Sequence, residues 1–164
     1  AQRHAERRGA LEVEIAGTVC RLTGRADRID AYADGQAAIR DFKTGATPSA
    51  KQVQLGLAPQ LPLTAMMLSE GAFGDVPPLP VRSADYVKIG AARDPVSVVS
   101  FDDAEELTQL AADARDKLTR LWASFLYGAP FTPLLRPEWV RADGTYHHLA
   151  RVKEWRSADE AGDG

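Results

Sequence analysis

The sequence predicts an α/β (α+β) domain in which a central mixed sheet is flanked by helices. Two observations carry this prediction. Apolar and polar residues alternate in several short segments, which is the period of a half-buried strand. Between and after these segments the apolar residues recur at helical spacing, most clearly over 104–127. At 164 residues with 45% apolar composition, the chain is expected to form one domain over 1–164.

Three antiparallel strands are expected first, over 10–17, 19–31 and 36–42. The first alternates Leu11, Val13 and Ile15 with glutamates, and the Asp34-Gly35 dipeptide favours a tight hairpin turn between the other two. The preceding residues 1–9 are basic and lack an apolar stripe, so we interpret them as the end of a helix whose start lies outside this sequence.

Helices and two more strands are expected in the second half. Residues 49–73 have helical character, with a bend or restart near Pro59 and Pro62, because proline fits only the first turn of a helix. After a proline-rich linker over 76–83, the β-branched segments 84–90 and 95–101 predict strands. Asp102 or Asp103 is expected to cap the long helix.

Composition excludes several classes of protein. The net charge of −3 gives no global attraction to nucleic acid, so DNA binding would rest on local patches. The single cysteine, Cys20, excludes a disulfide framework and a four-cysteine metal centre, and we expect it to be a small buried residue of a cytoplasmic protein. No apolar run approaches the roughly 20 residues of a membrane span. The absence of a phosphate-binding loop excludes a helicase motor.

The segment 24–45 concentrates charge where a half-buried hairpin would normally be apolar. Asp41 and Lys43 share one face of their strand, with α-carbons roughly 6.5 Å apart, and hairpin pairing can bring Asp27 opposite Asp41. Two carboxylates and a lysine fit Mg²⁺ chemistry, in which the lysine orients or helps deprotonate water. The alternative is a solvated face of surface ion pairs.

A longer pattern favours the first interpretation. It reads Gly-x-x-Asp-Arg-Ile-Asp, a turn, Ile-x-Asp-Phe-Lys-Thr-Gly, and then a helix containing Pro-Gln-Leu. This pattern resembles the RecB-type nuclease domains of the PD-(D/E)XK superfamily, with its restriction-endonuclease-like core. The stretch from Asp41 to Leu68 and the ending "YHHLARVKEW" look like the C-terminal nuclease domains of AddB-type helicase–nuclease subunits.

The resemblance implies roles for particular residues. Asp27 and Asp41 would be metal ligands, the Phe42 main-chain carbonyl a further ligand and Lys43 the catalytic lysine, while Gln60 would turn toward the active site. The implied metal is Mg²⁺, with Mn²⁺ possible, and the implied partners are DNA and an AddA-type helicase–nuclease subunit. The implied activity is that of a deoxyribonuclease, specifically an exonuclease, in double-strand break repair and recombination.

The sequence departs from the family pattern at three points. The upstream helix with an acidic or histidine ligand is mostly missing, which leaves His4 and Glu6 as poor candidates. No cluster of four cysteines is present, so no iron–sulfur cluster is expected, and a stand-alone nuclease of the cluster-bearing kind found in CRISPR systems is disfavoured. Thr64 stands where relatives often carry tyrosine.

Other chemistry-bearing residues have weaker interpretations. A metal site made of Asp143, His147 and His148 is disfavoured, since adjacent histidines on a loop point different ways. Lys51, Arg25 and Arg28 flank the expected cleft, where they are phosphate contacts or solvated surface. Met66, Met67, Trp122 and Phe125 are expected in the core, and Phe42 is expected to pack against the helices. A catalytically inactive DNA-holding scaffold remains the alternative function.

Overall fold

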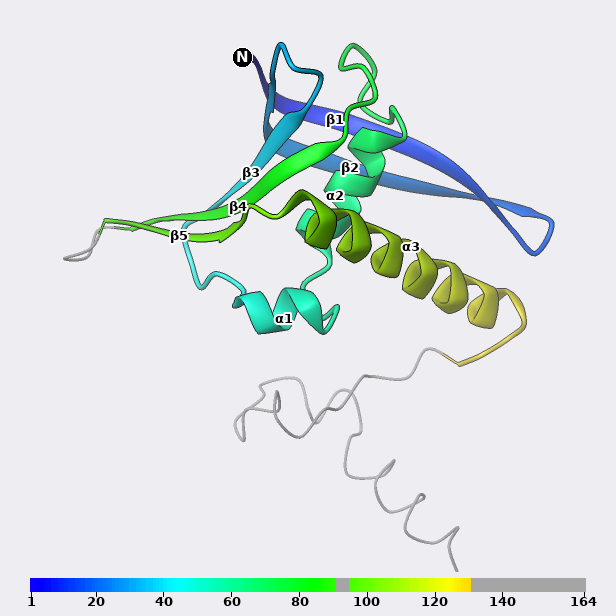
Figure 1. Ribbon diagram of the computed structural model, residues 1–164. Coiled ribbons are helices and arrows are strands. Elements are labelled where there is room, and N and C mark those ends of the chain that lie inside the picture. Colours follow the sequence, from blue (N-terminus) through cyan, green and yellow to red (C-terminus); the bar gives the residue numbers. More distant parts are fainter. Residues whose placement is uncertain (91–94, 131–164) are drawn as a thin grey trace, which may run out of the picture. The chain divides into compact units, whose positions relative to one another are not determined.

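In the computed structural model, residues 1–90 and 95–130 are described, and the fold is a five-stranded mixed sheet flanked by helices (Figure 1). The strand order across the sheet follows the sequence. The strands are β1 (Gln2–Ile15), β2 (Thr18–Ala31), β3 (Ala37–Lys43), β4 (Val81–Ile89) and β5 (Val96–Phe101). The helices are α1 (Ala50–Gln54), α2 (Gln60–Ser69) and α3 (Ala104–Leu126). These elements all belong to the compact unit Ala1–Leu126, and a second unit covers Tyr127–Gly164.

One parallel pair makes the sheet mixed. β3 and β4 run parallel, whereas the other three neighbouring pairs are antiparallel. Parallel neighbours require a long crossover, and here that crossover carries α1 and α2. The crossover therefore brings the start of α2 back to β3, where the charged segment lies.

The expected break in the first helical segment is confirmed. α1 starts with a capping box, in which the Ser49 hydroxyl oxygen accepts from the Gln52 backbone N–H and the Gln52 side-chain oxygen accepts from the Ser49 backbone N–H. α2 restarts with Pro59 as its N-cap, and Pro62 falls within the first turn, where a missing N–H costs nothing. Asp103 caps α3 as expected, with its Oδ1 accepting from the backbone N–H groups of Glu105 and Glu106.

Residues 2–9 form part of β1, so the expectation of a helix end over 1–9 is wrong. This stretch pairs with β2 along its length, and cross-strand hydrogen bonds supply the backbone partners that a helix would otherwise provide. His4 lies opposite Ile29 and is only 4% exposed. Gly9 lies so close to Phe73 that an added Cβ would be 2.7 Å from its ring carbons. The burial of His4 and the close packing of Gly9 against Phe73 thus hold this stretch against the fold, although its sequence has no apolar stripe.

The alternation of core-facing and outward-facing side chains in the long β1–β2 hairpin is interrupted at Glu6 and Asp27. These two residues are skipped in the strand register, and Glu6 has a positive φ of 50°. Ala26 and Ile29 are three residues apart and yet both are buried in one core cluster. Strict alternation would put them on opposite faces. The irregularity adds no residue to either strand, but it re-aims the side chains next to it.

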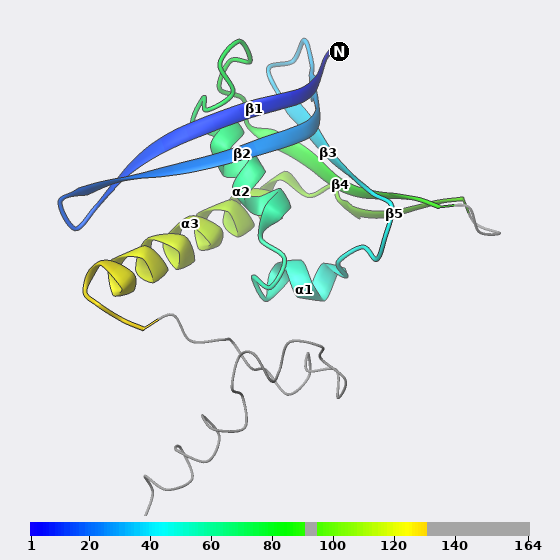
Figure 2. The ribbon, with the colours of Figure 1, turned by 180° about the vertical axis from the view of Figure 1, so that it is seen from behind.

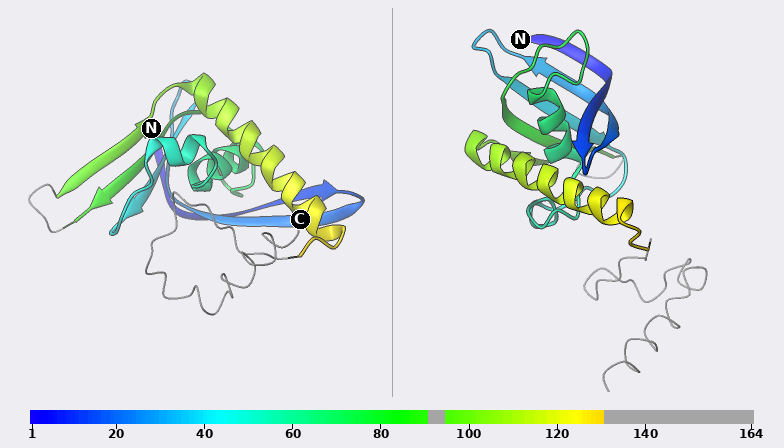
Figure 3. Two further views of the ribbon diagram at one scale, coloured as in Figure 1. Left: turned by 90° about the horizontal axis from the view of Figure 1, so that it is seen from below. Right: turned by 90° about the vertical axis from the view of Figure 1, so that its right-hand side faces the viewer.

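The core lies between the sheet and the helices α2 and α3 (Figures 2 and 3). Met66 and Met67 are each 3% exposed, which confirms their expected place in the core. α3 buries Leu107 and Leu110 near its start, whereas Trp122 is only half-buried. The expectation that Trp122 is core is therefore wrong, because the second half of α3 extends beyond the strands that the first half covers.

Two further expectations about burial are also wrong. Phe42 is 40% exposed, because the helices pack on the face of β3 that carries Ile39 and Asp41, and alternation turns Phe42 to the other face. Cys20 is a free, half-buried cysteine rather than a buried one, since it lies near the end of the hairpin opposite Val13. None of the described helices is long and apolar enough to cross a membrane.

Candidate active site

Asp41 and Lys43 lie side by side on the face of β3 that is covered by the helices. The Lys43 Nζ is 2.7 Å from the Asp41 Oδ2, and the Asp41 side chain is 7% exposed against 28% for Lys43. The period of the strand places both side chains on this face, as the sequence predicts. Asp41 is thus a nearly buried carboxylate whose charge is balanced by a neighbour with access to solvent.

Gln60 joins this pair from the start of α2. Its side-chain amide donates to the Asp41 Oδ1, and its Oε1 accepts from the Lys43 Nζ at 2.8 Å. Thr64, one turn further along, donates its hydroxyl to the Gln60 main-chain oxygen at 2.8 Å instead of reaching the cluster. Gln60 therefore holds the carboxylate and the ammonium in one fixed arrangement.

Asp27 completes the cluster through the main chain of β3. Its Oδ2 accepts from the backbone N–H of Phe42 at 2.9 Å. β3 pairs with β2 only as far as Arg40, so the Asp27 side chain takes over where the ladder of main-chain bonds ends. The sequence-predicted residues Asp27, Asp41, Lys43 and Gln60 are thus brought together at one place.

The electrostatics of the cluster centre on Asp41. Burial raises the pKa of the Asp41 carboxyl and the negative charge of Asp27 raises it further, against the lowering effect of Lys43. Tyr86 lies opposite Asp41 in the register of β3 and β4, and it is fully buried. Burial raises the pKa of Tyr86 to about 12, so its phenol stays neutral. The Lys43 Nζ lies 5.7 Å from the centre of the Tyr86 ring, within the range of a cation–π contact.

The donor set suits a hard divalent cation in part. The Asp41 Oδ2 is buried and has the Lys43 ammonium as its partner at 2.7 Å, and carboxylate oxygens are the preferred ligands of Mg²⁺. No group of three or more carboxylate, histidine or cysteine side chains with metal-binding geometry occurs among residues 1–90 and 95–130. The described residues therefore offer two carboxylates and the neighbouring main chain, and no third acidic ligand.

The remaining candidates lie in different surroundings. His4 is buried opposite Ile29 with no hydrogen bond to its Nε2, and Glu6 lies at the hairpin irregularity. Lys51 is exposed on α1. Arg28 does not flank the cluster as expected, because it faces the other side of the sheet and pairs with Asp30 at 2.8 Å. Asp143, His147 and His148 lie outside the described residues.

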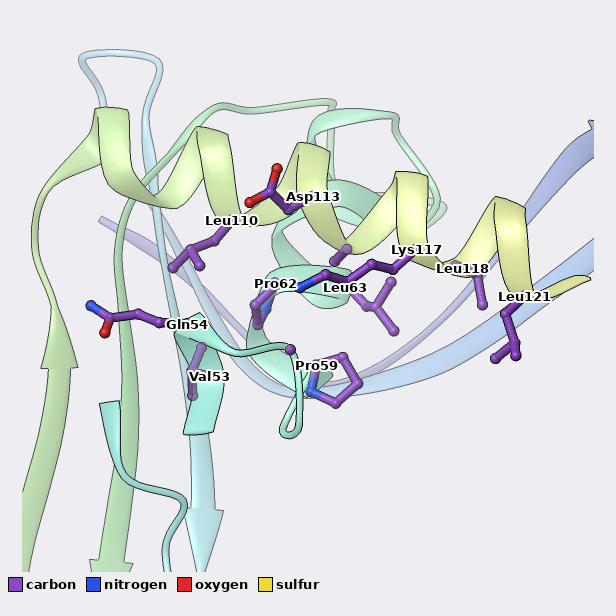
Figure 4. Close-up of a pocket in the computed structure, with 12 residues that line it drawn as sticks. Val53, Gln54, Pro59, Pro62, Leu63, Leu110, Asp113, Lys117, Leu118 and Leu121 are labelled. Atoms are coloured by element: carbon purple, nitrogen blue, oxygen red, sulfur yellow. The ribbon is translucent and has the colours of Figure 1, made fainter. Parts of the chain in front are cut away.

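An apolar pocket lies apart from the charged cluster. Side chains from α1, the turn before α2, the start of α2 and the side of α3 line it (Figure 4). Its apolar lining includes Val53, Pro59, Leu63, Leu110 and Leu118, and its charged lining residues are Asp113 and Lys117. None of the four clustered residues lines this pocket, so the charged cluster and this apolar pocket are separate features.

Comparison with known proteins decides the family. A family model for the PD-(D/E)XK nuclease superfamily matches residues 1–135. The chain belongs to the PD-(D/E)XK nuclease superfamily. Membership in this superfamily implies a nuclease, which would bind DNA and which in this superfamily generally uses divalent metal ions.

Individual relatives cover smaller parts of the chain. An uncharacterized protein of Rickettsia felis is 41% identical over 68 residues, and one of Rickettsia conorii is 40% identical over the same length. These segments cover 42% of this chain but only 8% of each relative's length. The crystal structure of SSO0001 aligns with 70% of this chain and 50% of its own, at 19% identity and a TM-score of 0.43.

Proposed function

We propose that this PD-(D/E)XK domain hydrolyses DNA phosphodiester bonds in a Mg²⁺-dependent reaction, as the nuclease domain of an AddAB-type helicase–nuclease. The observation that carries the proposal is the cluster of Asp41, Lys43 and Gln60 with Asp27 beside it. Membership in the nuclease superfamily agrees with it. The short share of the relatives' length that is matched agrees with a domain of a longer protein.

In this proposal, Asp27 and Asp41 hold the metal ion, and the Phe42 carbonyl is a further ligand. The bound ion would polarise the phosphate and lower the pKa of a water molecule. Two further residues of the chain have separate roles. Lys43 places its ammonium beside the nucleophile and balances the charge of Asp41, and Gln60 keeps both groups in position through its two hydrogen bonds.

Lys43→Ala is the decisive variant. It should abolish cleavage of linear duplex DNA and leave folding and DNA binding nearly unchanged, because a partly exposed lysine beside two carboxylates contributes little to packing. The assay follows product formation over a Mg²⁺ titration, with Mn²⁺ in parallel, and with ATP and the AddA-type subunit supplied. Lys117→Ala removes the same charge from α3, away from the cluster, and should cleave at the parental rate.

Asp41→Ala separates metal binding from the later steps. It should also abolish cleavage, since a single remaining carboxylate holds Mg²⁺ poorly, and raising the metal concentration should restore part of the activity. No metal concentration should restore Lys43→Ala. Cleavage by Lys43→Ala at the parental rate would contradict the nuclease proposal. DNA binding without cleavage by the parent protein would instead support an inactive DNA-holding scaffold.

A further inference from the structure

The outer part of the β1–β2 hairpin carries a group of exposed arginines that the cluster does not use. Arg8, Arg21 and Arg25 line a shallow hollow together with Thr23 and Gly24. All three arginines are exposed. They lie on the side of the hairpin away from the helices, because the intervening Leu22 and Gly24 face the core, where Gly24 approaches Met67. We call this surface the arginine face.

The arginine face is electrostatically unfavourable on its own. Arg8 lies directly opposite Arg25 in the strand register, and like charges in such a pair destabilise a sheet. Arg8 and Arg21 make no ion pair with any residue in the part of the chain that the structure describes. Arg25 has only a long contact, with its guanidinium 3.9 Å from the Asp27 Oδ1. Glu12 lies directly opposite Arg21 in the register, but no ion pair joins them among the described residues, so positive charge is in excess on this face.

The arginine face, on the side of the hairpin away from the helices, meets the candidate active site at Asp27. Arg21, Thr23, Arg25 and Asp27 are spaced two residues apart along β2, and the contact between Arg25 and Asp27 shows that these two share a side. At Asp27 the strand alternation is interrupted, and the Asp27 side chain turns to the main chain of Phe42, next to Asp41. The irregularity in β2 thus connects the outer face of the hairpin to the acidic cluster.

We propose that the arginine face binds the phosphodiester backbone of the DNA strand on its way to the acidic cluster. Guanidinium groups bind phosphate oxygens through paired hydrogen bonds, and Arg21 and Arg25 lie about 13 Å apart along an extended strand, which suits contacts to more than one phosphate. A bound strand would also remove the repulsion between Arg8 and Arg25. The inference names the substrate path of the proposed nuclease and rests on that proposed function.

The test measures DNA binding in the absence of divalent metal, so that it does not depend on cleavage. The probe is a fluorescently labelled duplex with a single-stranded end, and its anisotropy is titrated with the full chain at several salt concentrations. The variant Arg8→Gln with Arg21→Gln should bind about tenfold more weakly, and its slope of log affinity against log salt should be smaller by about two. The matched control, Arg115→Gln with Arg120→Gln on α3, should stay within about twofold of the parent.

Three further measurements separate a loss of phosphate contacts from a loss of folding. Thermal unfolding should show no loss of stability in the double variant, because Arg8→Gln removes a like-charge pair. If the double variant does unfold, Arg21→Gln alone should still reduce the salt slope by about one. Arg8→Lys with Arg21→Lys should keep the parental slope, because phosphate neutralisation depends on charge.

Cleavage assays separate this inference from the proposed function. With Mg²⁺, the double variant should show a raised KM and an unchanged kcat, because Arg8 and Arg21 do not touch the acidic cluster. Binding by the double variant with the parental affinity and salt slope would overturn the inference, whatever the cleavage result. A parent that binds DNA through the arginine face but never cleaves it would contradict the nuclease proposal alone.

Discussion

Asp30 is the residue whose replacement should most sharply test the described packing. It lies on the face of β2 opposite the helices, with its side chain 4% exposed. The Arg28 Nε is 2.8 Å from its Oδ2, which also pairs with Arg40, and the Arg3 Nε is 3.3 Å from its Oδ1. Arg40 also pairs with Asp85 at 3.1 Å, so the network crosses from β1 to β4. Asp30→Ala would leave these guanidinium groups close together without their shared anion.

The expected loss follows from how exposed each arginine is. Removing one partner of a buried ion pair typically costs about 3–5 kcal/mol. Arg3 is 66% exposed and contributes as little as a surface pair, whereas Arg28 and Arg40 are 25% and 28% exposed and contribute most of the effect. We therefore expect Asp30→Ala to lower the free energy of unfolding by about 3 kcal/mol. For a chain of this size, that corresponds to a fall in Tm of roughly 6–12 °C.

Urea unfolding at neutral pH measures this loss, with Asp34→Asn as the control. Asp34 pairs with Arg82 at 3.1 Å, but both side chains are exposed, so its loss should stay below about 1 kcal/mol. If Asp30→Ala is no more destabilising than Asp34→Asn, the network does not hold the strands together as described.

The pH dependence gives an independent check on Asp30. Burial opposes its ionisation, but the guanidinium groups of Arg28, Arg3 and Arg40 outweigh burial and hold the pKa below the ordinary value of 3.8. A lowered pKa in the folded state means that ionised Asp30 stabilises the fold fully above the unfolded value, and that this stability is lost as the pH falls through the folded value. The difference between the parent and Asp30→Asn should therefore be constant near neutral pH and shrink below about pH 4.

Two further predictions concern packing. Phe42→Ala should cost about 1 kcal/mol in urea unfolding, because the ring is 40% exposed, and a loss in the range of about 3–5 kcal/mol would mean that it is packed as a core residue. Gly9→Ala should cost about 1–3 kcal/mol, since its new Cβ would meet the Phe73 ring at 2.7 Å. Gly45→Ala is the matched control and should change the stability by less than about 0.5 kcal/mol, because no atom lies within 4 Å of the added carbon; a comparable loss in both variants would contradict the close approach at Gly9.

The elements with a strong local signal could be predicted from the sequence. The 3.6-residue period of α3, the prolines that restart α2 and the turn at Asp34-Gly35 act over a few residues, so the sequence is sufficient. The beginning of the first strand could not be predicted in this way. Residues 1–9 have no alternation of their own, and residues 2–9 become a strand because a long partner strand lies beside them. Pairing with β2 decides the conformation of this stretch, and the local sequence gives no sign of that pairing.

The charged residues of the site could be predicted for a different reason. Asp41 and Lys43 share a face by strand parity alone, whereas Gln60 is expected only from the resemblance of its segment to the family's helix motif. The side that the helices cover could not be derived in this way. Parity separates Asp41 from Phe42, but it does not say which of the two faces the helices, and the buried face here is the acidic one.

Asp27 shows how the site depends on a departure from regular structure. In an unbroken β2, parity would place Asp27 with Ile29 and would also place Arg25 on that same face, which the helices cover. The interruption at Asp27 instead leaves Ala26 and Ile29 in the core while Arg25 stays exposed. Asp27 can then contact Arg25 on one side and the Phe42 N–H on the other. A regular hairpin would have to bury Arg25 or withdraw Asp27 from Asp41, so the irregularity is what allows a buried acidic cluster to adjoin an exposed basic surface.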